Sequence, residues 1–283
     1  MRRRVWCETL PYAEVGRPGL VALLRARQVE VLLAVRPWQL AEVGATVASL
    51  VDGGVAVGLW PMVADADGRW VSAGTAAAWV AFADQALAAA PRATELVLDL
   101  EPPLAQLAAW KGGRLTLAGR PTPAAYAEAR AVLATAVERW RLDRRVTTAL
   151  LPMLVAELGG EWLQRLLGTP ASRLPVDRHS VMAYTSLYEG WSRGLVGRRR
   201  AEALLVATAR LARLRFGGAA ALSLGCVDTG ALGDEPAYRD PAELARDVAL
   251  ARRVGVDEVT VFDLGGMVRR GPVERWLDAF AAR

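Results

Sequence analysis

Two carboxylates stand at the end of an apolar segment in the middle of the chain. Residues 95–103 read Glu-Leu-Val-Leu-Asp-Leu-Glu-Pro-Pro, which places Asp99 and Glu101 where a buried strand ends. Burying one ionised carboxylate is costly, and burying two close together is worse. The pattern therefore indicates either a chemical site or a strand end that enters solvent.

Alternation along a strand favours the chemical site. Asp99 and Glu101 share one face with Val97, and Leu98 and Leu100 share the other face. If the leucines pack on surrounding helices, both acids point toward the same space. Each charge then raises the pKa of the other carboxyl, and partial burial acts in the same direction. A carboxyl that stays protonated near neutral pH is what a general acid requires.

The rest of the chain supplies the elements that must position this pair. Short apolar runs predict eight strands, at residues 5–9, 29–35, 55–61, 95–100, 146–151, 179–184, 220–227 and 258–263. Segments of helical period follow each run, at residues 19–28, 39–52, 75–90, 122–141, 161–167, 199–213, 241–254 and 272–282. Parallel strands need crossover helices and read as continuous apolar runs, so this order predicts one (β/α)8 TIM barrel over residues 1–283.

Active sites of such barrels lie at the carboxyl ends of the strands. The polar and aromatic residues expected there are Glu8, Trp60, Asp99, Glu101, Tyr184, Thr185, Asp228 and Asp263. We expect Glu101 and Asp99 to be catalytic, and Glu8, Trp60, Thr185, Asp228 and Asp263 to contact the substrate. A catalytic role for Tyr184 follows from the resemblance described next.

These residues resemble glycoside hydrolase family 18, the chitinase-like hydrolases. That family carries Asp-x-x-Asp-x-Asp-x-Glu on strand four and Met-x-Tyr-Asp on strand six. The resemblance implies that Glu101 is the proton donor, that Asp99 assists the N-acetyl group of the substrate, and that Tyr184 contacts this group. Thr94 and Val97 stand where the signature has its earlier aspartates, and Thr185 replaces the aspartate of Met-x-Tyr-Asp.

Three other interpretations stay open. Retaining glycosidases pair an acid with a nucleophilic carboxylate ~5–5.5 Å away, a role that Asp228 on strand seven could fill. A barrel that binds saccharides without cleaving them would tolerate the missing signature residues. A magnesium-dependent lyase or hydrolase would use the oxygen ligands of Glu8, Asp99, Glu101, Asp228 and Asp263. The preferred interpretation needs no metal and no cofactor.

Other motifs are less specific. His179, the sole histidine, begins strand six and is interpreted as structural, so a zinc site is not expected. Gly265-Gly266 is interpreted as a turn rather than a phosphate site. Aromatic rings suit sugar faces, and Trp38, Trp60, Trp70 and Trp191 are expected near the catalytic face. The tryptophans in helical patterns are expected in the core: Trp79, Trp140, Trp162 and Trp276.

Composition bounds the remaining possibilities. The chain has 283 residues and a formal net charge of +5, carried by arginine because Lys111 is the only lysine. The short clusters at residues 2–4 and 198–200 do not form the basic surface of a nucleic-acid binder. Two cysteines give no disulfide framework, and no apolar run is long enough for a membrane span. We expect a cytoplasmic protein with a carbohydrate or other small-molecule ligand.

Overall fold

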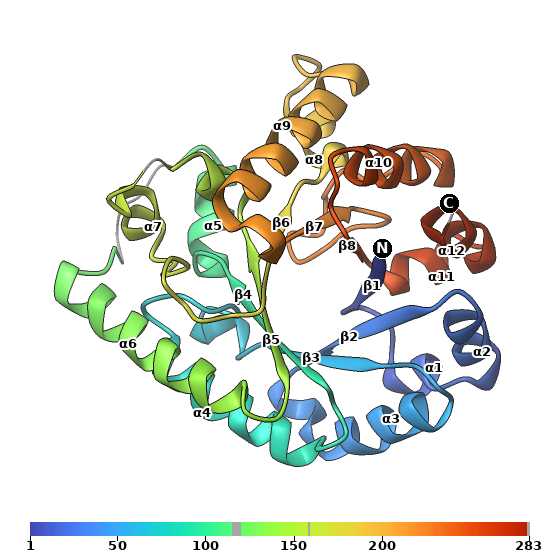
Figure 1. The fold of residues 1–283 in the computed structure, drawn as a ribbon, viewed down its shortest axis with the longest axis horizontal. Helices are drawn as coiled ribbons and strands as arrows, with labels where there is room; N and C mark the ends of the chain where they lie inside the picture. Colours follow the sequence, from blue (N-terminus) through green and yellow to red (C-terminus); the bar gives the residue numbers. More distant parts are fainter. Residues whose placement is uncertain (115–119, 158, 282–283) are drawn as a thin grey trace.

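A closed eight-stranded parallel barrel forms the centre of the molecule, with the helices around it (Figure 1). The computed structural model describes residues 1–114, 120–157 and 159–281. Neighbouring strands pair in chain order and β8 pairs with β1, which closes the sheet. The predicted single (β/α)8 barrel is confirmed. The strands are β1 (Arg2–Cys7), β2 (Val29–Val35), β3 (Val57–Pro61), β4 (Glu95–Leu100), β5 (Arg145–Leu150), β6 (Arg178–Met182), β7 (Ala220–Gly225) and β8 (Glu258–Phe262).

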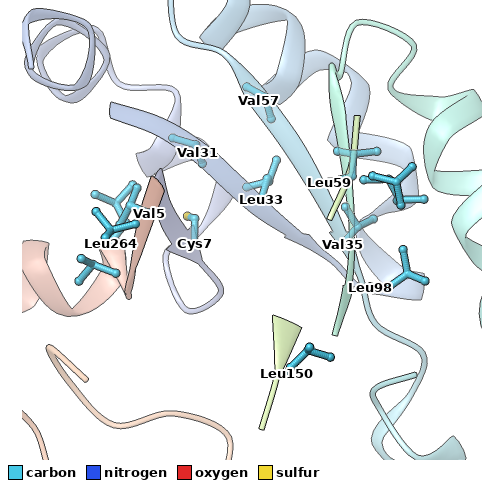
Figure 2. Packing of buried hydrophobic residues seen from close by; sticks show 14 of the residues in the cluster. Val5, Cys7, Val31, Leu33, Val35, Val57, Leu59, Leu98, Leu150 and Leu264 are labelled. Carbon is cyan, nitrogen blue, oxygen red and sulfur yellow. The ribbon is translucent and has the colours of Figure 1, made fainter. Parts of the chain in front are cut away.

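Two apolar layers result from the alternation of side chains along each strand. On β4, Leu96, Leu98 and Leu100 join the large cluster between the barrel and the helices, part of which Figure 2 shows. Val97 instead joins a smaller cluster inside the barrel. The predicted division of β4 into two faces is therefore confirmed, and the same division holds on β2, where Leu33 faces outward and Leu32 inward.

The helices that follow the strands are α2 (Pro18–Ala26), α3 (Leu40–Asp52), α4 (Ala76–Ala89), α6 (Pro123–Trp140), α7 (Trp162–Leu167), α9 (Arg198–Phe216), α10 (Pro241–Arg253) and α12 (Val273–Ala281). Local capping explains where two of these helices, α6 and α10, begin. Thr122 accepts a hydrogen bond from Ala125 N at 3.2 Å, and Asp240 accepts one from Ala242 N at 2.8 Å. Residue 282, the last of the predicted closing helix, lies outside the described residues.

Shorter helices interrupt the expected loops at the carboxyl end of the barrel. They are α1 (Tyr12–Val15), α5 (Leu104–Lys111), α8 (Thr185–Trp191) and α11 (Leu264–Arg269), with 3-10 turns η1 (Pro37–Gln39), η2 (Asp65–Asp67) and η3 (Pro152–Ala156). A further 3-10 turn, η4 (Gly217–Ala219), leads into β7 at the amino-terminal end. The sequence predicted no helix over residues 104–111, where α5 lies, and a turn at Gly265-Gly266, which belong to α11. None of the helices within the described ranges is long and apolar enough to cross a membrane.

Buried ion pairs fill the amino-terminal end of the barrel. The Arg4 guanidinium is fully buried and pairs with Glu95 and, at 2.8 Å, with Glu258. Glu95 also accepts a hydrogen bond from Thr147 Oγ1 at 2.5 Å, and Arg2 pairs with it at 3.0 Å. These buried charges therefore compensate one another at the amino-terminal end of the barrel.

The tryptophans separate into core and surface. Trp79, Trp140 and Trp276 are buried, as the helical patterns predicted. The prediction for Trp162 is wrong, because its side chain is 61% exposed. It is the first residue of the short helix α7, which has too few turns to follow a periodic pattern.

Candidate active site

A cavity of about 780 Å³ opens at the carboxyl ends of the strands. The residues that line it at or just after strand ends are Trp6, Glu8, Trp60, Asp99, Glu101, Ala149, Leu151, Met182, Tyr184, Cys226 and Phe262. Helices α5 and α8, the segment after α8 and the loop after β7 supply most of the rim, among them Trp110, Lys111, Trp191, Arg193 and Glu235. The lining is therefore an aromatic surface into which a few carboxylates project.

Strand β4 delivers the central pair. Asp99 lies one residue before the end of β4 and is 3% exposed, whereas Glu101, just beyond the strand, is partly buried. Val71 N donates a hydrogen bond to the carbonyl of Asp99 at 2.8 Å, which ties the loop after β3 to this strand end. Both carboxyl groups line the cavity, as alternation along the strand predicted.

Burial dominates the electrostatics of the pair. It raises the pKa of Asp99 to about 7, while Glu101, Trp60 and Arg69 oppose the shift. Burial also raises the pKa of Glu101 well above its ordinary value, and the neighbouring Asp99 charge raises it further. Glu235 acts on this pKa in the same direction and Arg69 opposes it. Burial and the neighbouring carboxylate therefore both favour the protonated form of Glu101.

Four aromatic rings surround the pair. The Trp6 and Trp60 ring centroids are 4.5 Å apart, and the Phe262 ring centroid lies 6.5 Å from that of Trp60 and 6.4 Å from that of Tyr184. All four side chains are at most 9% exposed. They form the apolar walls of the inner cavity, with the polar edges of Trp60 and Tyr184 available to a ligand.

Two buried polar atoms in this wall have no hydrogen-bond partner among the described residues. They are Oδ1 of Asp99 and Nε1 of Trp60. The indole lies close enough to lower the pKa of Asp99, yet the two groups do not meet the geometry of a hydrogen bond. An acceptor and a donor left unpaired in the same cavity are available for a polar ligand.

Glu8 also lines the cavity, but its charge is already compensated. Arg69 forms an ion pair with Glu8 and a second one with Asp65 at 2.8 Å. Arg69 adopts a left-handed backbone conformation, with φ of 67°, and its guanidinium lies 5.5 Å from the ring centroid of Trp70. This ion pair anchors the loop after β3 beside the cavity.

Three of the predicted substrate contacts do not line the cavity. Thr185 is fully buried and donates its hydroxyl hydrogen bond to Asp247 of α10. Asp228 forms an ion pair with Arg269 at 2.7 Å. Asp263 caps α11 through a 2.8 Å bond from Gly266 N and accepts a bond from Thr9 Oγ1 at 2.9 Å. Each polar group has a structural partner that lies far from it in the chain or in a helix the sequence did not predict.

The other predicted positions separate in a similar way. Trp60, Trp70 and Trp191 line the cavity, whereas Trp38 does not and is 68% exposed. His179 stacks on Phe216 at 4.1 Å, and burial lowers its pKa to about 4. The interpretation of Gly265-Gly266 as a turn is wrong, since both residues belong to α11. A β-carbon on Gly266 would lie 2.7 Å from Cβ of Asp228, so close packing requires glycine there.

Sequence reasoning missed Glu235. This residue lies in the loop between β7 and α10, lines the cavity and is 8% exposed. Its carboxylate accepts hydrogen bonds from Gly230 N at 2.8 Å and Leu232 N at 2.7 Å. No strand-end rule could select it, because it stands ten residues after Gly225, the end of β7.

Within the described ranges, no three His, Cys, Asp or Glu side chains are grouped so that they could hold a metal ion.

Comparison with known proteins identifies structural neighbours only. No family model matches the sequence, and no curated protein matches it. The PgaB (BpsB) glycoside hydrolase domain from Bordetella bronchiseptica superimposes with a TM-score of 0.59 at 13% identity, over 100% of this chain and 99% of that one. The chitinase RmChi1 from Rhizomucor miehei gives 0.56 at 13% identity, over 99% of each chain.

A third neighbour is the exo-β-1,4-mannosidase Op5Man5 from Opitutaceae bacterium strain TAV5. It gives a TM-score of 0.62 at 13% identity, over 99% of this chain and 58% of that one. At these identities the likeness establishes the barrel fold and leaves the chemistry to the residues of the cavity.

Proposed function

We propose that this barrel cleaves glycosidic bonds, with Glu101 as the general acid. The observation that carries the proposal is a carboxyl group with a strongly raised pKa, held beside a second carboxylate in an aromatic cavity. Such groups are concentrated at catalytic sites, because a general acid must remain protonated near the working pH. The three structural neighbours, a glycoside hydrolase domain, a mannosidase and a chitinase, are consistent with the proposal.

The proposed step begins with a sugar whose ring stacks on the aromatic walls. Glu101 donates its proton to the glycosidic oxygen as the bond from this oxygen to the anomeric carbon breaks. The carbon becomes positively charged, and Asp99 stabilises this charge as a nearby carboxylate. Tyr184, whose pKa burial keeps well above its ordinary value, remains a neutral phenol that can orient the substrate.

The resemblance to family 18 further implies an N-acetylated sugar, whose acetamido group Asp99 would assist. Val97 occupies one signature position, and it packs among apolar side chains inside the barrel. The neighbouring aspartate of that signature therefore has no counterpart beneath Asp99. We accordingly include sugars with and without an acetamido group in the test.

The two other interpretations make different predictions. Saccharide binding without turnover would identify a lectin-like barrel. Activity that disappears with EDTA and returns with magnesium would identify a metal-dependent lyase or hydrolase. Two of the carboxylates that such a metal would need are engaged elsewhere, since Asp228 pairs with Arg269 and Glu8 with Arg69.

The first test replaces Glu101 by Gln, which keeps the shape of the side chain and removes its proton. Release of reducing ends is measured on β-1,4-linked N-acetylglucosamine and mannose oligosaccharides. We expect the variant to lose about 10²–10⁴-fold in kcat/KM on whichever series the wild type cleaves, the usual contribution of a general acid. Wild-type activity should fall as pH rises through the pKa of Glu101, because the ionised group cannot donate.

Glu189→Gln is the matched control. Glu189 lies on α8, pairs with Arg239 at 3.1 Å and does not line the cavity. Its replacement should leave turnover and the pH profile unchanged. Wild-type turnover by Glu101→Gln would refute the role of the acid.

A further inference from the structure

A general acid acts from one side of the scissile bond, and hydrolysis needs a second group on the other side. Asp99 lies on β4 and Glu101 just beyond its end, two residues apart, so both approach from one wall of the cavity. A carboxylate that activates water must come from the opposite wall. In the closed barrel, the strands three and four places from β4 are β7 and β8 on one side and β1 on the other.

Three other carboxylates follow the strands on that side. Glu8 after β1 lines the cavity but pairs with Arg69. Asp228 after β7 pairs with Arg269, Asp263 after β8 caps a helix, and neither lines the cavity. Glu235 differs from them. It lines the cavity, and no arginine or lysine of the described ranges forms an ion pair with it.

The loop holds this carboxylate in one orientation. Gly230 N and Leu232 N donate to its two oxygens, one each, which leaves a second acceptor position on each oxygen. Gly230 separates the carboxylate from the Phe262 ring: a β-carbon there would lie 3.1 Å from Oε1 of Glu235 and 3.2 Å from Cε1 of Phe262. Glu235 therefore borders the same aromatic wall that surrounds the β4 pair.

We propose that Glu235 is the base that activates the attacking water, which makes the enzyme an inverting hydrolase. This inference rests on the proposed function. Glu101 gives its proton to the leaving oxygen as the bond to the anomeric carbon breaks. The water oxygen bonds to that carbon from the opposite face, and its released proton passes to Glu235. Glu101 ends ionised and Glu235 protonated, and solvent exchange restores both groups.

The experiment uses 2,4-dinitrophenyl β-glycosides of N-acetylglucosamine and mannose as probes, together with the matching oligosaccharides. Dinitrophenolate leaves without protonation, so a variant that lacks only the acid keeps most of its activity on these probes. We expect Glu101→Gln to lose activity on oligosaccharides only. Glu235→Ala should lose about 100-fold or more on both substrates, in line with the loss of a general base.

Chemical rescue separates chemistry from loop structure. Azide needs no base, so it should raise the rate of Glu235→Ala at least tenfold and give a glycosyl azide of inverted configuration. Glu235→Gln, which keeps one acceptor for the loop, should be rescued in the same way. Asp234→Asn is the control on the same loop, an exposed residue that pairs with Lys111, and should keep wild-type turnover within about threefold.

Several results would overturn the proposal. Retained anomeric configuration in the wild-type product would exclude an inverting base, and hydrolysis confined to the N-acetylated series would assign the role to the acetamido group. Either result leaves Glu101 as the acid. Near wild-type turnover by Glu235→Ala, or a folded Glu235→Ala that azide does not rescue, would also refute it. Absence of hydrolysis by the wild type on all the probes would refute the proposed function and this inference together.

Discussion

At the scale of single residues, the cavity concentrates groups that folding alone would avoid. Asp99 and Glu101 are carboxyl groups two residues apart, enclosed by aromatic rings and without an ion-pair partner in the described ranges. Burial raises the pKa of both carboxyl groups, so ionising them in the folded protein costs free energy. Ionising them in the unfolded chain carries no such cost. The pair therefore lowers the free energy of unfolding at pH values where the two groups ionise, and this effect can be measured.

We expect Glu101→Gln to stabilise the protein at pH 8 but not at pH 4. The pKa of Glu101 is higher in the folded protein than in the unfolded chain. At pH values below the unfolded-state pKa, this group therefore costs no stability. Stability is lost as the pH rises toward and through the folded-state pKa. A tenfold change in proton affinity corresponds to ~1.4 kcal/mol, so a gain of roughly 1–3 kcal/mol is expected at pH 8. Urea unfolding at both pH values measures it, with Glu189→Gln as control. A gain of equal size at both pH values would assign the effect to packing instead.

At the scale of elements, the loop between β7 and α10 is the segment that completes the cavity. It runs from Cys226, which lines the cavity, through Glu235 to the helix cap at Asp240. Helix α10 also holds the loop in place, because Asp247 of the helix accepts a hydrogen bond at 2.8 Å from the hydroxyl of Tyr238 in the loop. The position of Glu235 thus depends on a well-capped helix.

Asp240→Ala should therefore reduce stability by about 1 kcal/mol, the usual cost of losing an N-cap. Asp240 accepts hydrogen bonds from Ala242 N at 2.8 Å and Glu243 N at 3.1 Å, and alanine can accept neither. Thermal unfolding provides the measurement. Asp240→Asn is the matched control, since asparagine also caps helices and should lose much less. Equal losses in the two variants would show that the charge, and not the cap, is what matters.

At the scale of the whole molecule, the barrel has two ends with opposite electrostatic design. At the carboxyl end, Asp99 and Glu101 form no ion pair with a residue of the described ranges. At the amino end, Arg4, Glu95 and Glu258 are buried and paired. Removing one member of a buried ion network leaves another charge uncompensated, which is far more costly than losing an exposed pair.

We predict that Glu95→Leu destabilises the protein by roughly 3–5 kcal/mol, because Arg4 loses a buried partner. Glu30→Gln, which removes a more exposed partner of Arg2, should cost less than ~1 kcal/mol. Urea unfolding compares the two variants. The pH profile of activity should not change in either, since both residues lie at the end remote from the cavity. Similar costs would contradict the compensation described for this network.

The order of residues was sufficient to predict the barrel and the position of Asp99 and Glu101 at the carboxyl end of β4. Period two over residues 95–101 assigned Asp99 and Glu101 to the interior, and apolar runs located eight strands, because both signals depend only on near neighbours in the chain. Which other residues line the cavity was decided by the tertiary structure. Thr185 and Asp263 form hydrogen bonds with structural partners, and Glu235 lines the cavity from the middle of a loop. The path of a loop depends on contacts between residues distant in sequence, such as Asp247 with Tyr238 and Thr185, and no local pattern encodes them.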